Sequence, residues 1–178
     1  MKELGKVLAY VLRHRPDAAG ITLDAHGWAD VDALIGGICA MGRKMDRATL
    51  EEIVATDEKF RFSFNQDGSK IRANQGHSVQ VDVQPEERVP LDILYHGTAQ
   101  KSVADILRDG IQKRTRLFVH LSADEATAGK VGARHGQPVV LQIDAKRMYA
   151  DGYKFYFSAN GVWLTEYVPS AYIAPVRA

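Results

Sequence analysis

The sequence is poor in residues that cross-link or anchor a chain. Cys39 is the only cysteine among 178 residues, which excludes an intrachain disulfide and a cysteine-rich zinc site. A reducing, cytoplasmic location fits this composition, and we expect Cys39, among apolar neighbours, to be a buried and unreactive thiol. No run of 18 apolar residues occurs, so no membrane span is expected. The first residues predict an amphipathic helix rather than a signal sequence.

The chain also has no large excess of positive or negative charge. The formal net charge is +1, and residues 1–85 hold 11 Lys and Arg against 12 Asp and Glu. A broad basic face for non-specific nucleic-acid binding is therefore not expected, and phosphate recognition would depend on a few locally placed arginines. The chain also lacks a glycine-rich dinucleotide fingerprint and a P-loop, so a bound nucleotide would not lie on either of those scaffolds.

The segment Leu12-Arg13-His14-Arg15-Pro16 ends the first expected helix, which runs from about Lys2 to His14. At 100° per residue, Arg13 lies opposite the apolar stripe of this helix and His14 lies at its edge. Arginine binds phosphate through a planar fork, and histidine exchanges a proton near neutral pH. The segment is either such a site or a basic helix end that complements the helix dipole.

The rest of the first half predicts a winged-helix-like order of three helices and a β-hairpin. A short strand and a turn are expected between Gly20 and Trp28, and Asp30 and Asp46 are expected to cap the second and third helices. The hairpin follows from alternating phenylalanines at 60, 62 and 64 and from the turn signal Asp67-Gly68.

The hairpin turn fixes which residues share a face. With Asp67-Gly68 as the loop, Phe64 pairs with Ile71, and Ser63 and Arg61 pair with Arg72 and Asn74. One face is then apolar, and the other is rich in donors and runs into Gln75-Gly76-His77-Ser78. This polar face is either a solvated surface or a ligand surface. Arg72 in particular is either hairpin surface or a phosphate contact, and His77 could instead be a capping or core histidine.

The second half predicts a small β-structure with peripheral helices, after a polar linker from Asp82 to Pro90. The expected helices run from about Gln100 to Arg108 and from a capping box at Ser122–Glu125 to Arg134. The expected strands are Ile93–Tyr95 running into His96-Gly97-Thr98, Leu117–Val119 running into His120-Leu121-Ser122, Pro138–Ile143, Tyr153–Phe157, Val162–Leu164 and Tyr172–Ile173.

Eight segments, taken in order, resemble one family over nearly the whole chain. They are Leu12-Arg13-His14-Arg15-Pro16; Leu23-Asp24 with Gly27-Trp28; Arg61-Phe62; Ile71-Arg72-Ala73-Asn74-Gln75-Gly76-His77-Ser78; Tyr95-His96-Gly97-Thr98; His120-Leu121-Ser122; Gly132-Ala133-Arg134-His135-Gly136; and Asn160-Gly161-Val162-Trp163-Leu164-Thr165. Together they resemble the NAD⁺-dependent RNA 2′-phosphotransferase family, which removes the 2′-phosphate left at some RNA ligation junctions.

The resemblance implies an α+β fold with a winged-helix-like RNA-binding lobe over residues 1–84. Residues 85–178 would form an ADP-ribosyltransferase-like lobe with a split β-sheet that binds NAD⁺. The implied enzyme transfers an internal RNA 2′-phosphate to NAD⁺ through an RNA-2′-phospho-ADP-ribose intermediate. The products would be 2′-OH RNA, nicotinamide and ADP-ribose 1″,2″-cyclic phosphate. Two alternatives stay open: a transferase that caps nucleic-acid 5′-phosphates with ADP-ribose, and a non-catalytic RNA- or ADP-ribose-binding module.

The resemblance also implies roles for individual residues. The catalytic set would be Arg13, His14, Arg61 and Arg134. NAD⁺ would contact His96, Gly97, Thr98, His120, Leu121, Ser122, Gly132 and Val162, and RNA would contact Arg72, Asn74, Gln75, His77 and Ser78.

Two of these roles stay open at this point. Arg134 would contact either the 2′-phosphate or the NAD⁺ diphosphate, and His14 would be either a phosphate donor or an acid–base group. Val162 stands in place of the glutamate of protein-modifying transferases, which argues against ordinary protein ADP-ribosylation. We expect no metal, no membrane, a monomer, and a tRNA-like RNA as partner.

Overall fold

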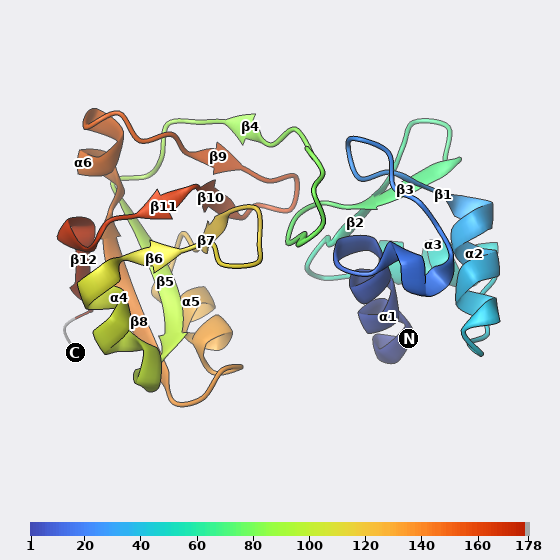
Figure 1. Ribbon diagram of the computed structural model, residues 1–178, viewed down its shortest axis with the longest axis horizontal. Helices are drawn as coiled ribbons and strands as arrows, with labels where there is room; N and C mark the ends of the chain where they lie inside the picture. Colours follow the sequence, from blue (N-terminus) through green and yellow to red (C-terminus); the bar gives the residue numbers. More distant parts are fainter. Residues whose placement is uncertain (177–178) are drawn as a thin grey trace. The chain divides into compact units, whose positions relative to one another are not determined.

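The computed structural model describes residues 1–176. The chain divides into two compact units, an N-terminal unit (Met1–Gln84) and a C-terminal unit (from Pro85 to the end of the chain) (Figure 1). Each unit has its own cluster of buried hydrophobic residues, so each is described by itself below. Over residues 1–176, no helix is both long enough and apolar enough to span a membrane.

The N-terminal unit combines three α-helices with a three-stranded antiparallel sheet of order β1-β3-β2. Its elements are α1 (Lys2–Arg13), a 3₁₀ turn η1 (Pro16–Ala19), β1 (Ala29–Asp30), α2 (Val31–Ala40), α3 (Arg47–Ala55), β2 (Phe62–Phe64) and β3 (Lys70–Ala73). Both predicted caps are confirmed. The Asp30 carboxylate accepts from Ala33 N at 2.8 Å, and that of Asp46 accepts from Thr49 N at 2.7 Å.

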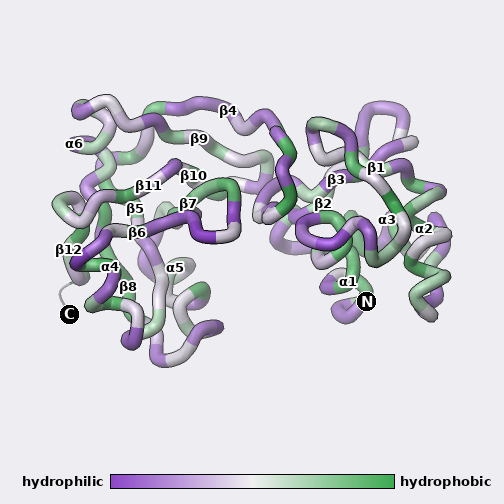
Figure 2. The backbone as a smooth tube through the Cα atoms, in the orientation of Figure 1, coloured by the Kyte–Doolittle hydropathy of each residue, from purple (hydrophilic) through white to green (hydrophobic). Residues whose placement is uncertain are grey.

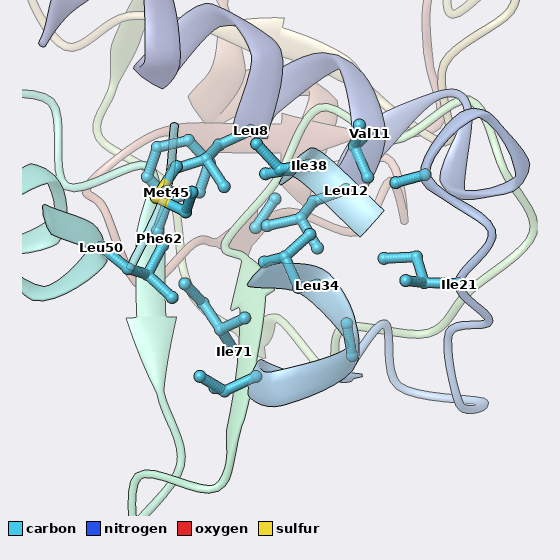
Figure 3. Packing of buried hydrophobic residues seen from close by; sticks show 14 of the residues in the cluster. Leu8, Val11, Leu12, Ile21, Leu34, Ile38, Met45, Leu50, Phe62 and Ile71 are labelled. Atoms are coloured by element: carbon cyan, nitrogen blue, oxygen red, sulfur yellow. The ribbon is translucent and has the colours of Figure 1, made fainter. Parts of the chain in front are cut away.

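The hairpin register is the predicted one. Phe64 faces Ile71, Ser63 faces Arg72, and Asn74 N donates to the Arg61 carbonyl at 2.8 Å. The apolar hairpin face therefore reaches the core of the unit. Figure 3 shows that core, where residues from all three helices and from β2 and β3 meet: Leu8, Val11, Leu12, Leu34, Ile38, Leu50, Phe62 and Ile71, each at most 4% exposed.

The strand expected between Gly20 and Trp28 does not form. The Asp24 carboxylate instead accepts from the backbone amides of His26 and Trp28, both at 3.0 Å. These bonds stabilise a local turn, which replaces the backbone hydrogen bonds that a strand would make with a neighbouring strand. The short strand β1 begins only at Ala29, which faces Ile71 of β3.

Cys39 is exposed, so the expectation of a buried thiol is wrong. Leu34 and Ile38 occupy the buried face of α2, and the next residue lies about 100° further around the helix. The Cys39 thiol donates to the Met45 carbonyl at 3.2 Å. Apolar neighbours in the sequence therefore did not place this side chain in the core.

The C-terminal unit is built from antiparallel strands in three small sheets, of orders β4-β9-β10-β7, β12-β8-β5 and β11-β6. Its strands are β4 (Glu86–Glu87), β5 (Ile93–Ala99), β6 (Ile111–Gln112), β7 (Val119–Leu121), β8 (Pro138–Asp144), β9 (Tyr156–Phe157), β10 (Trp163–Thr165), β11 (Tyr167–Val168) and β12 (Ile173–Pro175). Its helices are η2 (Gln100–Ser102), α4 (Val103–Asp109), α5 (Glu125–Gly132), α6 (Ala145–Ala150) and η3 (Ser170–Tyr172). Within this mixed α+β unit, paired backbone bonds between Tyr95 and Ser122, at 2.8 and 2.9 Å, connect the two larger sheets.

Several expected boundaries in this unit are wrong. The expected linker contains β4, a hydrophilic stretch in Figure 2, because Glu86 and Glu87 pair with β9. The cap of α5 is Asp124, which accepts from Thr127 N at 2.7 Å, since the backbone of Ser122 is already paired with Tyr95. The helix ends at Gly132 rather than Arg134, and the expected strand at Leu117–Val119 begins only at Val119. The helix α6 and the strands β6 and β11 were not expected.

Candidate functional site

The Arg13–His14 pair at the end of α1 is held by a neighbouring backbone segment, Gly76–Val79, here called the strap. The amides of Ser78 and Val79 donate to the Arg13 carbonyl at 2.9 and 3.4 Å. A hydrogen bond of 2.8 Å joins the Ser78 hydroxyl to His14 Nδ1. Two residues assigned to different roles by resemblance, catalytic His14 and RNA-binding Ser78, are therefore in direct contact.

The Arg13 guanidinium lies on the strap. Gly76 has a φ of +90°, and a Cβ built there would come within 3.3 Å of Arg13 Cζ and Nε. The Nε and Nη2 atoms of Arg13 are buried. Arg13 is thus not the solvated helix end that its position opposite the apolar stripe allowed, because the strap covers that side of the helix.

Arg61 is positioned by the carboxylate of Asp57, whose side chain is only 8% exposed. Asp57 Oδ1 lies 3.0 Å from Arg61 Nη1, and Oδ2 accepts from the Arg61 amide at 2.6 Å. Two bonds to one carboxylate fix both the backbone and the guanidinium of Arg61.

Asn74 is buried rather than part of a solvated hairpin face. Its amide group donates to the Phe60 carbonyl at 2.6 Å and accepts from the Ser63 hydroxyl at 2.8 Å. Asn74 pairs with Arg61, and Gly76, two residues further on, lies under Arg13. Because two residue steps span at most about 7 Å, the strap and the hairpin bring the segments of Arg13 and Arg61 close together.

Among the remaining candidate RNA residues, His77 is buried, and Arg72 and Gln75 are partly buried. Arg72 stacks over the Trp28 ring at 4.5 Å and donates to the His26 carbonyl at 3.3 Å. Gln75 Oε1, Arg72 Nε and both ring nitrogens of His77 are buried and have no hydrogen-bond partner among residues 1–176. Buried polar atoms of this kind are where a ligand or an ordered water binds.

His77 is held neutral by its surroundings. Burial lowers its pKa to about 4, and the nearby positive charges of Arg13, His14 and Arg72 act in the same direction. A neutral ring beside Arg13 adds no further positive charge and keeps one nitrogen as an acceptor.

In the C-terminal unit, two histidines have fixed tautomers. His96 Nδ1 lies 3.2 Å from the His120 carbonyl, which can only accept, so His96 carries its hydrogen on Nδ1. Burial lowers the pKa of His96, which keeps the ring neutral with a lone pair on Nε2. His120 Nδ1 lies 2.9 Å from Arg116 Nη1, which can only donate, so the hydrogen of a neutral His120 lies on Nε2.

Gly97 and Gly132 allow α5 to lie directly on β5. A Cβ at Gly97 would come within 1.7 Å of the Ala128 carbonyl oxygen, and one at Gly132 within 2.7 Å of the Thr98 carbonyl oxygen. Thr98 is 8% exposed between them. The structure therefore shows a packing reason for both glycines.

The other candidate NAD⁺ residues lie on β7 or beside β10. Leu121 is 1% exposed and pairs with Trp163, and the Val162 amide donates to the Ser158 hydroxyl at 2.9 Å. Arg134 is exposed, just past the end of α5.

Arg116 was not among the predicted site residues, but it contacts His120, which was. Arg116 Nη1 lies 2.9 Å from His120 Nδ1, and the pKa of the Arg116 guanidinium is lowered by partial loss of hydration and by the positive charge of Arg134. Like charges close together favour a bound anion. The sequence places Arg116 before an apolar strand, and only the turn at residues 113–118 brings it back onto His120.

No group of three His, Cys, Asp or Glu side chains suited to a metal ion occurs in the part of the chain that the structure describes. In each unit the candidate residues include arginines, whose planar guanidinium groups are suited to binding phosphate.

The chain belongs to the RNA 2′-phosphotransferase family, Tpt1 / KptA family, whose model matches residues 1–167. The resemblance drawn from the eight motifs is thereby confirmed, and so is the expectation of a transferase enzyme.

Curated relatives align with this chain over almost their full lengths. A probable RNA 2′-phosphotransferase of Nostoc punctiforme is 51% identical over 174 residues, 98% of this chain and 96% of the relative. Proteins described in the same words from Agrobacterium fabrum and Pseudomonas syringae pv. tomato are 50% and 49% identical, over 94% and 98% of this chain and 90% and 94% of their own lengths.

Proposed function

We propose that the chain removes an internal 2′-phosphate from a tRNA-like RNA by transferring it to NAD⁺. The products would be 2′-OH RNA, nicotinamide and ADP-ribose 1″,2″-cyclic phosphate, and we expect the enzyme to act as a monomer. The observation that carries the proposal is the Arg13–His14 pair, which the strap fixes through Ser78 and Gly76. Family membership supports the choice of RNA as substrate.

The N-terminal unit supplies the phosphate donors. We assign Arg13 and Arg61 to the 2′-phosphate, because an arginine stays protonated while charge accumulates on the phosphate oxygens during transfer. Arg61 Nη1 is paired with the Asp57 carboxylate. The other N–H donors of the planar Arg61 guanidinium are suited to binding two phosphate oxygens. We propose the winged-helix-like arrangement of this unit as the RNA-binding lobe, with Arg72, Gln75 and His77 near the same ligand.

The proposed role of His14 depends on its second ring nitrogen, Nε2. Since Nδ1 is bonded to Ser78, we assign Nε2 to the phosphate, either as a donor or as the group that protonates the departing RNA 2′-oxygen.

The C-terminal unit is proposed to bind NAD⁺, which supplies an electrophilic ribose carbon with nicotinamide as its leaving group. The candidate side chains of this unit are chemically suited to NAD⁺. His96 is neutral with Nε2 as an acceptor suited to a ribose hydroxyl, and Arg116 and Arg134 are cations suited to a diphosphate. We propose an ADP-ribosyltransferase-like arrangement for this unit, with Val162 standing where a protein-modifying member carries glutamate.

The direct test is to incubate the protein with NAD⁺ and a short RNA that carries one internal 2′-phosphate. We expect loss of the phosphate and one nicotinamide released per RNA. Transfer of ADP-ribose to a 5′-phosphate alone would favour the capping alternative, and binding without nicotinamide release would favour a binding module. RNA that keeps its 2′-phosphate contradicts the proposal.

Two substitutions test the phosphate assignment. Arg13→Ala and Arg61→Ala should each slow the reaction by about two or more orders of magnitude, as loss of a transition-state donor does elsewhere. Arg15→Ala is the matched control, because Arg15 is exposed and paired with Asp17 at 2.7 Å. Unchanged rates in both test variants would remove the proposed phosphate donors.

His14→Ala distinguishes the two roles of that ring. Accumulation of an RNA–ADP-ribose adduct, detected by mass spectrometry, would place His14 in the second step. Slow nicotinamide release without an adduct would place it in binding or in the first step.

A further inference from the structure

Phe60 is an exposed aromatic residue held in an unfavourable backbone conformation. It is 65% exposed, the most exposed of the large hydrophobic side chains described, and its φ is +44°. This left-handed region is uncommon for any residue with a Cβ and is a true outlier for a bulky one. Such conformations persist where surrounding bonds enforce them, and they concentrate at functional sites.

Both backbone polar groups of Phe60 are fixed by nearly buried partners. The Phe60 amide donates to the Asp57 carbonyl at 2.8 Å, and the Phe60 carbonyl accepts from Asn74 Nδ2 at 2.6 Å. Asp57 also holds both the amide and the guanidinium of Arg61. One bonded turn therefore presents an exposed phenyl ring and a candidate phosphate ligand from consecutive residues.

Phe60 and Arg61 are consecutive in the chain. Consecutive Cα atoms lie about 3.8 Å apart, so an aromatic ring and a guanidinium fork on them can span a base and its ribose phosphate. Proteins bind unpaired RNA bases by stacking them on exposed aromatic rings. We propose that Phe60 is a stacking platform for a nucleobase of the RNA, next to the 2′-phosphate held by Arg61. This inference rests on the proposed function.

The first test compares Phe60→Ala with the wild type on two RNAs, one complete and one abasic at the nucleotides flanking the 2′-phosphate. On the complete RNA we expect KM to rise about tenfold with kcat nearly unchanged, the size of one lost base stack. On the abasic RNA the two proteins should have similar KM values. Phe60→Trp should restore a low KM on the complete RNA, and Tyr10→Ala, on the exposed side of α1, is the matched surface control.

A second variant separates stacking from folding. Phe60→Gly removes the ring and also suits a positive φ, so the unfolding temperature should rise by about 2–4 °C while KM rises. A purely structural role would instead change stability and KM in the same unfavourable direction.

The outcomes are distinguishable from failure of the proposed function. An inactive wild-type protein contradicts the proposed function. An active wild type with an unchanged KM in Phe60→Ala overturns only the stacking platform. An equal KM increase on complete and abasic RNA also overturns it, since the ring would then contact something other than a base.

Discussion

Ser78 orients His14 through a single bond of 2.8 Å to Nδ1. Ser78→Ala removes that bond and leaves the strap backbone in place, so the imidazole loses its fixed orientation. We expect kcat to fall about tenfold, the worth of one ordinary hydrogen bond, with a smaller change in KM. Single-turnover rates on 2′-phosphorylated RNA measure this effect. Ser78→Thr keeps the hydroxyl and should recover most of the rate, and equal loss in both variants would contradict the orienting role.

His77 makes stability depend on pH. Its pKa is about 4 in the folded chain and near 6.5 when unfolded, so the unfolded chain binds more protons between these values. The contribution of the neutral His77 ring to the free energy of unfolding is therefore fully present above about pH 6.5 and is lost as the pH falls toward 4. Between pH 7 and pH 4.5 the free energy of unfolding should drop by about 2–3 kcal/mol through this residue.

Urea denaturation at both pH values measures the His77 contribution. In His77→Asn, which does not titrate, this part of the pH dependence should disappear, whereas in His26→Asn, a half-exposed ring, it should remain. An equal pH slope in wild type and His77→Asn would contradict the assignment.

At the scale of elements, the contact of α5 with β5 depends on glycine. Gly97→Ala would place a Cβ 1.7 Å from the backbone oxygen of Ala128, so helix and strand must separate. We expect a loss of at least about 3 kcal/mol in the free energy of unfolding, or failure to fold. Gly129→Ala on the same helix is the control, because its Cβ would lie 3.8 Å from Val140, and helix propensity predicts a gain of up to about 1 kcal/mol.

Elements set by local signals were predicted well. The caps Asp30 and Asp46 and the hairpin register depend on residues within a few positions of each other, and all three are confirmed. One local prediction failed, because a turn held by Asp24 replaces the expected strand between Gly20 and Trp28. Two errors in the C-terminal unit arise where a distant partner decides. Ser122 does not cap α5 because it pairs with Tyr95, and residues 86–87 are not a linker because they pair with β9.

The same division applies to the candidate site. The motifs identified Arg13 and His14, but the covering of Arg13 by the strap depends on residues more than 60 positions away. The burial of Asn74 and the contact of Arg116 with His120 likewise depend on how loops return to the chain. Hydrophobic periodicity and residue propensities in the sequence do not show which distant segment a loop contacts.

At the scale of the whole molecule, two separate hydrophobic cores predict two separate responses to ligands. Bound NAD⁺ should slow amide hydrogen exchange mainly within residues 93–162, and RNA carrying a 2′-phosphate mainly within residues 1–84, because a ligand stabilises the segment that binds it. Exchange followed by mass spectrometry measures both. NAD⁺ protection confined to residues 1–84 would contradict the assignment of ligands to units.

The exposure of Cys39 has a practical consequence. Because it is the only cysteine and its thiol lies at the surface, a maleimide dye or spin label should attach at one defined position without any substitution. The same thiol can link two copies under oxidising conditions, so purification and storage call for a reductant. Cys39→Ser would remove this background, after which a new cysteine at any chosen surface position becomes a unique spectroscopic reporter.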